Sequence, residues 1–141
     1  MEHWTIIWRD EFLCGNSKID FAHKFIIEKG TLLHQKLANP PHDEEELYNL
    51  AMEIADKIIE HMKVETEWMR EFNVIGHEAH IEDHDMYRSK FDLDKRYDIS
   101  KKMRLLMVAD MVWDYMNNHF YKFDLVDLKK VSQIIKNKHH K

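Results

Sequence analysis

The chain has 141 residues, enough for one domain with a hydrophobic core, and contains only 3 glycines and 2 prolines. So few turn-forming residues favour long helices over many short strands. The formal net charge of −5, with both signs mixed along the chain, gives no indication of a nucleic-acid-binding surface. Cys14 is the one cysteine, which excludes an internal disulfide and suits a reducing compartment.

Residues 1–16 are predicted to form an irregular arm. Trp4 to Trp8 alternates too briefly to make a sheet of its own, so we expect both tryptophans to pack over the rest of the domain. The first residues contain no basic cluster and no long apolar run. We therefore expect neither a signal peptide nor a membrane span, and we expect the cytoplasm as the location.

A first helix is predicted from Ser17, where Ser17 and Asp20 resemble a capping box, to about Ala38. Apolar residues recur every three or four positions along it, and His23 lies on this apolar face. His34 lies on nearly the same face. The eleven residues between them correspond to roughly 16 Å along a helix, which is too far for the two to share a metal.

A second helix is predicted after Asn39-Pro40-Pro41, with the acidic residues Asp43 to Glu46 near its start and its end near Phe72. His61 and Glu65 lie on its apolar face, one turn apart, about 6 Å along the axis. A carboxylate on such a face is costly to bury unless something pairs with it. The sequence therefore predicts a partner for Glu65 elsewhere in the chain.

A third helix is predicted from about His77 to Phe91, after a turn at Asn73 to Gly76 and before an exposed loop at Asp92 to Ile99. Its apolar face carries three histidines, more than packing requires. These are His77, His80 and His84.

A fourth helix is predicted after the N-cap residue Ser100, with His119 on its apolar face. Asp124 follows five residues later, an offset of about 140° on a regular helix. The two side chains can serve one site only if the helix ends or bends near Tyr121. A short helix is predicted from Leu125 onwards.

Four helices with apolar faces and short connections predict an all-α fold. We expect an antiparallel up-down-up-down four-helix bundle with an N-terminal arm and a short C-terminal helix. The chain is expected to form a single domain over residues 1–141, with the arm at 1–16, the bundle at 17–121 and a C-terminal segment at 122–141.

The apolar faces of all four helices carry imidazole groups. A single histidine in such a face is usually a core residue with a hydrogen-bond partner, but five would need five separate buried partners, whereas a metal satisfies them together. Five imidazoles and two carboxylates exceed one tetrahedral zinc site and suit two bridged metals. Imidazole with few carboxylates suits iron, although copper, zinc and nickel also accept imidazole. The candidate ligands are His23, His61, Glu65, His80, His84, His119 and Asp124.

Two other metal motifs are excluded by spacing. His77-Glu78-Ala79-His80 differs from the zinc-protease motif, because that motif needs histidines four residues apart and position 81 is isoleucine. No histidine has a glutamate three residues before it, as the ferritin-like di-iron proteins require. We interpret Asp20, Asp85 and Asp114 as ordinary surface or capping charges, and His77 as exposed or as supporting a ligand.

The order of the motifs resembles the hemerythrin family, and most closely its single-domain bacterial members. The residues that carry the resemblance are Gly15, Ile19-Asp20 and His23, then His61 and Glu65, then His80 and His84, and then His119 and Asp124. The resemblance implies two iron ions (Fe2+/Fe3+) with an oxo or hydroxo bridge. It implies one iron held by His80, His84 and His119, a second held by His23 and His61, and Glu65 and Asp124 bridging the pair.

The resemblance also implies reversible dioxygen binding, as an oxygen carrier, storage or delivery protein, and not an enzyme. The second iron has one ligand fewer, which leaves a position for dioxygen, and we expect Ile27 and Met116 to line an apolar pocket there. A carrier or delivery role further implies an unknown protein that accepts the oxygen as a partner. A di-iron enzyme or sensor acting on peroxide, nitric oxide or iron is the alternative, and a metal-free structural bundle is the remaining one.

Overall fold

A computed structural model describes residues 7–74, 77–96 and 99–139, without the side chains of 92–96 and 139. Across these residues the chain is helical and contains no strand, which is compatible with a helical bundle. The elements are η1 (Asp10–Phe12), α1 (Ser17–Ala38), α2 (Glu44–Glu71), α3 (His77–Arg96), α4 (Lys101–Asp114), the π-helix η2 (Tyr115–Asp124) and α5 (Leu125–His139). Trp4, expected to pack over the domain, lies outside the described residues.

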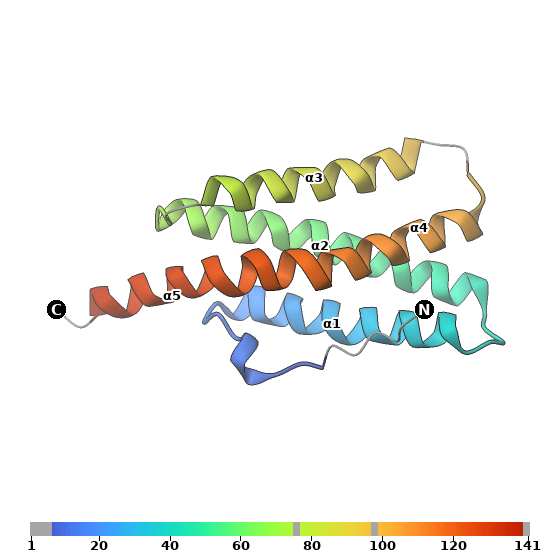
Figure 1. Ribbon diagram of the computed structural model, residues 1–141, viewed down its shortest axis with the longest axis horizontal. Helices are drawn as coiled ribbons and strands as arrows, with labels where there is room; N and C mark the ends of the chain where they lie inside the picture. The colour runs from blue at the N-terminus through green and yellow to red at the C-terminus, as the bar shows by residue number, and fades with distance from the viewer. Residues whose placement is uncertain (1–6, 75–76, 97–98, 140–141) are drawn as a thin grey trace.

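The helices lie lengthwise beside one another, and α5 continues the line of α4 across the molecule (Figure 1). The segment before α1 runs back along that helix. There Trp8 packs against the core, with its ring 5.6 Å from that of Phe12. None of the described helices is both long enough and apolar enough to cross a membrane.

Two apolar clusters form the core, and the polar candidate residues fall between them. On α1, His23 lies between Ile19 of the smaller cluster and Ile26 of the larger one. On α2, Glu65 lies between Met62 of the larger cluster and Met69 of the smaller one. The burial of these apolar side chains, each worth about 1.5–3 kcal/mol, holds the helices that carry the polar residues together.

The first helix is capped one residue earlier than the sequence indicated. The Asn16 side chain, not that of Ser17, accepts hydrogen bonds from the backbone N–H groups of Lys18 and Ile19, at 3.1 and 3.2 Å. The Asp20 carboxylate accepts instead from the N–H groups of Cys14 and Gly15, which connects the arm to α1. The expected capping box at Ser17 is therefore wrong.

Replacing Asn16 with alanine is expected to lower the free energy of unfolding by about 1 kcal/mol, because two N–H groups at the start of α1 lose their acceptor. Replacing Ser17 with alanine is the matched control, and we expect a change within about 0.5 kcal/mol. Urea denaturation of the two variants measures both values. A larger loss at Ser17 than at Asn16 would refute the cap assignment.

Two other boundaries differ from the sequence prediction. Helix α3 extends to Arg96, past the expected end at Phe91, so most of the expected loop is helical. The fourth helix neither ends nor bends sharply near Tyr121, contrary to expectation, because α4, η2 and α5 follow one another without a break. The expected cap of α4 at Ser100 is present, and Asp43, expected only as part of an acidic first turn, caps α2.

Candidate metal centre

The structure brings all seven candidate side chains together in the interior of the molecule. None of them is more than 2% exposed. Their donor atoms form two groups, and within each group all donors lie within 4.8 Å of one another. The first group is Glu65, His80, His84, His119 and Asp124, and the second is His23, His61, Glu65 and Asp124. The two carboxylates belong to both groups.

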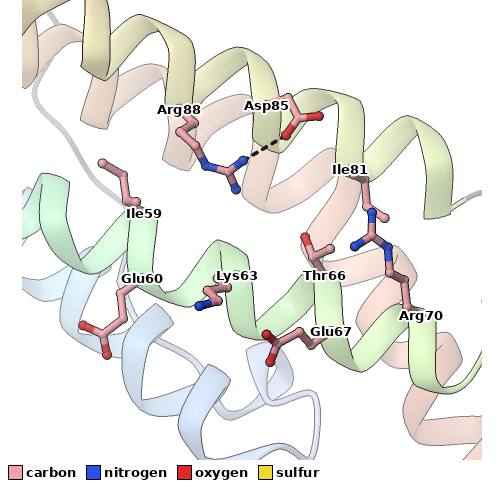
Figure 2. Close-up of a pocket in the computed structure, with 9 residues that line it drawn as sticks. All are labelled: Ile59, Glu60, Lys63, Thr66, Glu67, Arg70, Ile81, Asp85 and Arg88. Carbon is pink, nitrogen blue, oxygen red and sulfur yellow. Dashed lines mark hydrogen bonds and ion pairs between the residues drawn. The ribbon is translucent and has the colours of Figure 1, made fainter.

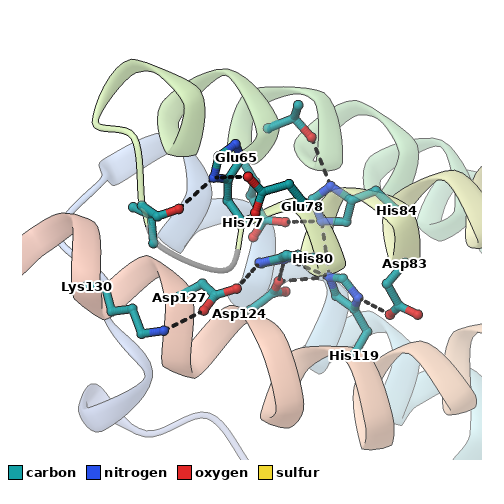
Figure 3. A network of polar contacts seen from close by, with 12 residues as sticks. Glu65, His77, Glu78, His80, Asp83, His84, His119, Asp124, Asp127 and Lys130 are labelled. Atoms are coloured by element: carbon teal, nitrogen blue, oxygen red, sulfur yellow. Dashed lines mark hydrogen bonds and ion pairs between the residues drawn. The ribbon is translucent and has the colours of Figure 1, made fainter.

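In the first group, three imidazole nitrogens converge on one point (Figure 3). The Nε2 atom of His119 lies 3.1 Å from Nε2 of both His80 and His84. Oδ1 of Asp124 lies 2.8 Å from Nε2 of His80 and 2.9 Å from Nε2 of His119. Oε1 of Glu65 lies 3.2 Å from Nε2 of His84. These donors come from α2, α3 and η2.

The second group contains two imidazoles together with the two shared carboxylates. Nε2 of His23 lies 2.9 Å from Oε2 of Glu65 and 3.1 Å from Oδ2 of Asp124. Nε2 of His61 lies 3.5 Å from Oε1 of Glu65. Each carboxylate therefore directs one oxygen towards an imidazole of each group, which is the arrangement of a carboxylate that bridges two cations.

The contacts in the cluster suit coordination of a metal, and they cannot all be hydrogen bonds. When two donors bind one ion at right angles through bonds of 2.0–2.2 Å, the two donor atoms lie about 3 Å apart. Nε2 of His119 carries at most one proton, yet it contacts two other imidazole nitrogens and a carboxylate oxygen. Oε1 of Glu65 is buried and accepts no hydrogen bond within the described structure. The buried cluster could hold a metal ion.

The opposite nitrogens of four imidazoles contact oxygen atoms. Nδ1 of His80 lies 3.1 Å from Asp127, and Nδ1 of His84 lies 3.0 Å from Thr66. Nδ1 of His119 lies 2.6 Å from Asp83, and Nδ1 of His61 lies 3.2 Å from the Lys57 carbonyl oxygen. An oxygen acceptor keeps a proton on Nδ1, so that Nε2 is the nitrogen whose lone pair can bind a metal in the cluster. This is the usual environment of a metal-binding histidine.

Sequence reasoning missed these supporting residues. Asp127 lies one helical turn after Asp124, a spacing that could have indicated it, whereas nothing in the pattern distinguished Asp83 from the other acidic residues of α3. Asp20 and Asp114, expected to be ordinary charges, hydrogen-bond to the arm and to Tyr87, and Asp85 pairs with Arg88.

The π-helix η2 explains the five-residue spacing of His119 and Asp124. In a π-helix the hydrogen bonds join residues five apart, so those residues lie on the same side. The side chains consequently meet, with Nε2 of His119 2.9 Å from Oδ1 of Asp124. π-Helical turns occur frequently at functional sites because they redirect side chains without ending the helix.

Burial and charge shift the pKa values of the cluster in opposite directions. Burial alone would lower the pKa of His23 and of His119, but hydrogen bonds and attraction to Asp124 and Glu65 outweigh it and raise these values to about 9 and about 10. Burial lowers the pKa of His61 to about 4. The pKa values of Glu65 and Asp124 lie well below their usual range, because nearby imidazoles outweigh burial.

Metal loading is expected to release about two protons per chain at pH 7.5. Without metal, His23 and His119 are protonated at this pH because their pKa values lie above it, and a metal must displace each proton to use the nitrogen lone pair. A titration in weak buffer with a pH indicator measures the release. Loading without any proton release would contradict the charge state assigned to these two imidazoles.

Three other residues singled out in the sequence lie outside the two donor groups. His77 is half-buried, and its Nδ1 donates to the Val74 carbonyl at 2.6 Å. Ile27 and Met116 are buried in the larger apolar cluster. Their role as walls of a ligand pocket stays a prediction.

Two surface hollows lie close to the cluster. One of about 390 Å³ between α1 and α2 is lined in part by His61, Ala22 and Val64. A groove of about 440 Å³ between α2 and α3 is lined by charged side chains together with Thr66, Ile59 and Ile81 (Figure 2). His61, which is 2% exposed, therefore lies at the inner edge of the first hollow, and Thr66 of the groove contacts Nδ1 of His84.

No protein-family model, no curated protein and no solved structure matches this chain. The geometry of the donor atoms therefore supplies the evidence for what the cluster does.

Proposed function

We propose that the cluster binds two iron ions and that the protein binds dioxygen reversibly, as a carrier, store or delivery protein. The observation that carries this proposal is the pair of donor groups that share Glu65 and Asp124. Three imidazoles on one side and two on the other leave the second ion one protein ligand short, and an open position is where a small molecule binds.

The proposal is also supported by the resemblance of the ligand order to the hemerythrin family. We propose the architecture of that family as well: one domain, an antiparallel up-down-up-down bundle, an N-terminal arm and a C-terminal helix. The cytoplasm and a protein acceptor of oxygen belong to the same proposal. Iron would supply the electrons that dioxygen takes up on binding and returns on release.

The residues of this chain would hold the two ions and separate them from solvent. Glu65 and Asp124, which each contact imidazoles of both groups, would hold both ions and keep them close together. The complete burial of the donors excludes bulk water and external reductants, which favours release of the bound molecule over its further reduction. The Phe120 ring, whose centroid lies 4.9 Å from that of His23, contributes to this apolar surrounding.

The test is to load the metal-free protein with ferrous iron under anaerobic conditions and then admit air. Reversible binding predicts two irons per chain and a ligand-to-iron charge-transfer band that appears in air and disappears when oxygen is removed. A band that decays while peroxide or nitric oxide is consumed would indicate a di-iron enzyme instead. Failure to bind iron at all would contradict the proposal.

Replacing His61 with leucine is expected to reduce the iron content from two ions to one per chain and to abolish the dioxygen band. The substitution removes a donor of the second group and leaves the first group complete. Elemental analysis and visible absorption measure the two effects. Replacing His77 with leucine is the control, since His77 lies outside both groups, and a similar loss in that variant would make the effect non-specific.

A further inference from the structure

Tyr115 lies inside the cluster, although the sequence did not indicate it. It is fully buried in η2, one turn before His119, and its ring stacks on that imidazole with a centroid distance of 4.9 Å. The hydroxyl lies within hydrogen-bond distance of Nε2 of His61, at 2.5 Å, and of Oδ2 of Asp124, at 3.0 Å. Both partners are candidate metal ligands.

These two partner atoms belong to the second donor group. His61 is absent from the first group, and Oδ2 of Asp124 is the oxygen that contacts His23, whereas Oδ1 contacts His80 and His119. The hydroxyl of Tyr115 therefore lies on the side of the ion that has fewer protein ligands.

The direction of one hydrogen bond follows from the tautomer of His61. Its Nδ1 faces the carbonyl oxygen of Lys57, which can only accept, so Nδ1 carries the proton and Nε2 carries a lone pair. With Nε2 unprotonated, the single proton of the Tyr115 hydroxyl faces two acceptors, Nε2 of His61 and Oδ2 of Asp124. An ion bound at Nε2 uses the same lone pair and removes this acceptor.

An ion held by both His61 and Asp124 competes with the buried Tyr115 hydroxyl for its two acceptors. A buried hydroxyl without a partner is costly, and water has no free access to a side chain that is 0% exposed. The position left open on the same ion is next to His61, and a small molecule that accepts hydrogen bonds would offer the hydroxyl a replacement acceptor there.

We infer that the Tyr115 hydroxyl donates a hydrogen bond to the small molecule held at the open position of the ion bound by His23 and His61. This inference rests on the proposed function, since it assumes that the second ion is present. Tyr115 is then a specificity-determining residue, which favours ligands that accept hydrogen bonds, such as dioxygen or azide, over poor acceptors such as carbon monoxide.

The experiment measures azide binding to the iron-loaded ferric protein and to two phenylalanine variants. Tyr115→Phe removes the donor, and we expect the dissociation constant for azide to rise about tenfold, because a hydrogen bond to an anion is lost. Tyr87→Phe is the matched control. Tyr87 is equally aromatic and buried, with its ring 5.5 Å from that of Tyr115, but its hydroxyl bonds to Asp114 and not to a candidate ligand.

Iron content separates this inference from the proposed function. Two irons in all three proteins, with weaker azide binding in Tyr115→Phe alone, supports the inference. Two irons with equal azide affinity in all three overturns it and leaves the proposed function intact. A visible tyrosinate-to-iron charge-transfer band that disappears in Tyr115→Phe also overturns it, because the phenol would then be a ligand and not a donor. A wild-type chain without the iron pair overturns both.

A second measurement covers the case in which Tyr115→Phe does not fold. The infrared band of azide bound to the wild-type ferric protein is recorded in ordinary and heavy water. A hydrogen bond from the hydroxyl predicts a shift between the two solvents, and identical band positions would overturn the inference.

Discussion

Replacing Glu65 with alanine is expected to abolish binding of the metal pair. Glu65 directs Oε2 towards His23 and Oε1 towards His84, so the substitution removes a donor from both groups at once. Loss of a residue that merely orients a ligand weakens metal binding about 10–100-fold, and loss of a shared ligand should cost more than about 100-fold at each ion. Equilibrium dialysis with ferrous iron measures the affinity.

Replacing Glu67 with alanine is the matched control for this experiment. Glu67 lies two residues further along the same helix, but it is exposed and belongs to neither donor group. We expect this variant to bind two irons with the affinity of the wild type. Two tightly bound irons in the Glu65 variant would show that this carboxylate does not bridge the ions.

Metal loading is expected to raise the melting temperature by roughly 10 °C. The donors come from α1, α2, α3 and η2, so an ion binds the folded chain and has no preformed site in the unfolded one. A ligand at 1,000 times its dissociation constant contributes about 4 kcal/mol, and 1 kcal/mol shifts the melting temperature of a chain of this size by about 3 °C. Thermal unfolding with and without ferrous iron, followed by circular dichroism, measures the difference.

The same experiment on the Glu65→Ala variant distinguishes specific binding from a general effect of the ion. That variant is expected to melt at the same temperature with and without iron, because the shared ligand is missing. A similar rise in both proteins would point to iron bound elsewhere, and no rise in the wild type would contradict a metal site that links the helices.

The fold could be predicted from the sequence where periodicity is strong and less well where local chemistry decides. The ends predicted for α1 and α2 from their apolar periodicity agree with the observed ends to within a residue or two. The cap was misplaced because Asn16 and Ser17 are both good N-cap residues, and only the structure shows that Asn16 makes the hydrogen bonds. The end of α3 was underestimated because the charged residues after Phe91 have no apolar period.

The candidate site could be predicted from the sequence because its donors interrupt apolar faces. Histidine and glutamate at positions such as His61 and Glu65 are conspicuous where packing calls for leucine or isoleucine. Tyr115 gave no such signal, since a buried tyrosine in an apolar face is an ordinary core residue until its hydroxyl is located. The five-residue spacing before Asp124 was recognised as a problem, but its solution by a π-helix depends on backbone geometry that periodicity does not reveal.

The most direct measurement is a crystal structure of the iron-loaded protein with anomalous scattering recorded at the iron edge. The proposal predicts two anomalous peaks about 3–4 Å apart, the separation usual for paired metal ions. One peak should lie among His80, His84 and His119, and the other between His23 and His61, with Glu65 and Asp124 contacting both. A single peak, or none within the cluster, would contradict the paired metal site.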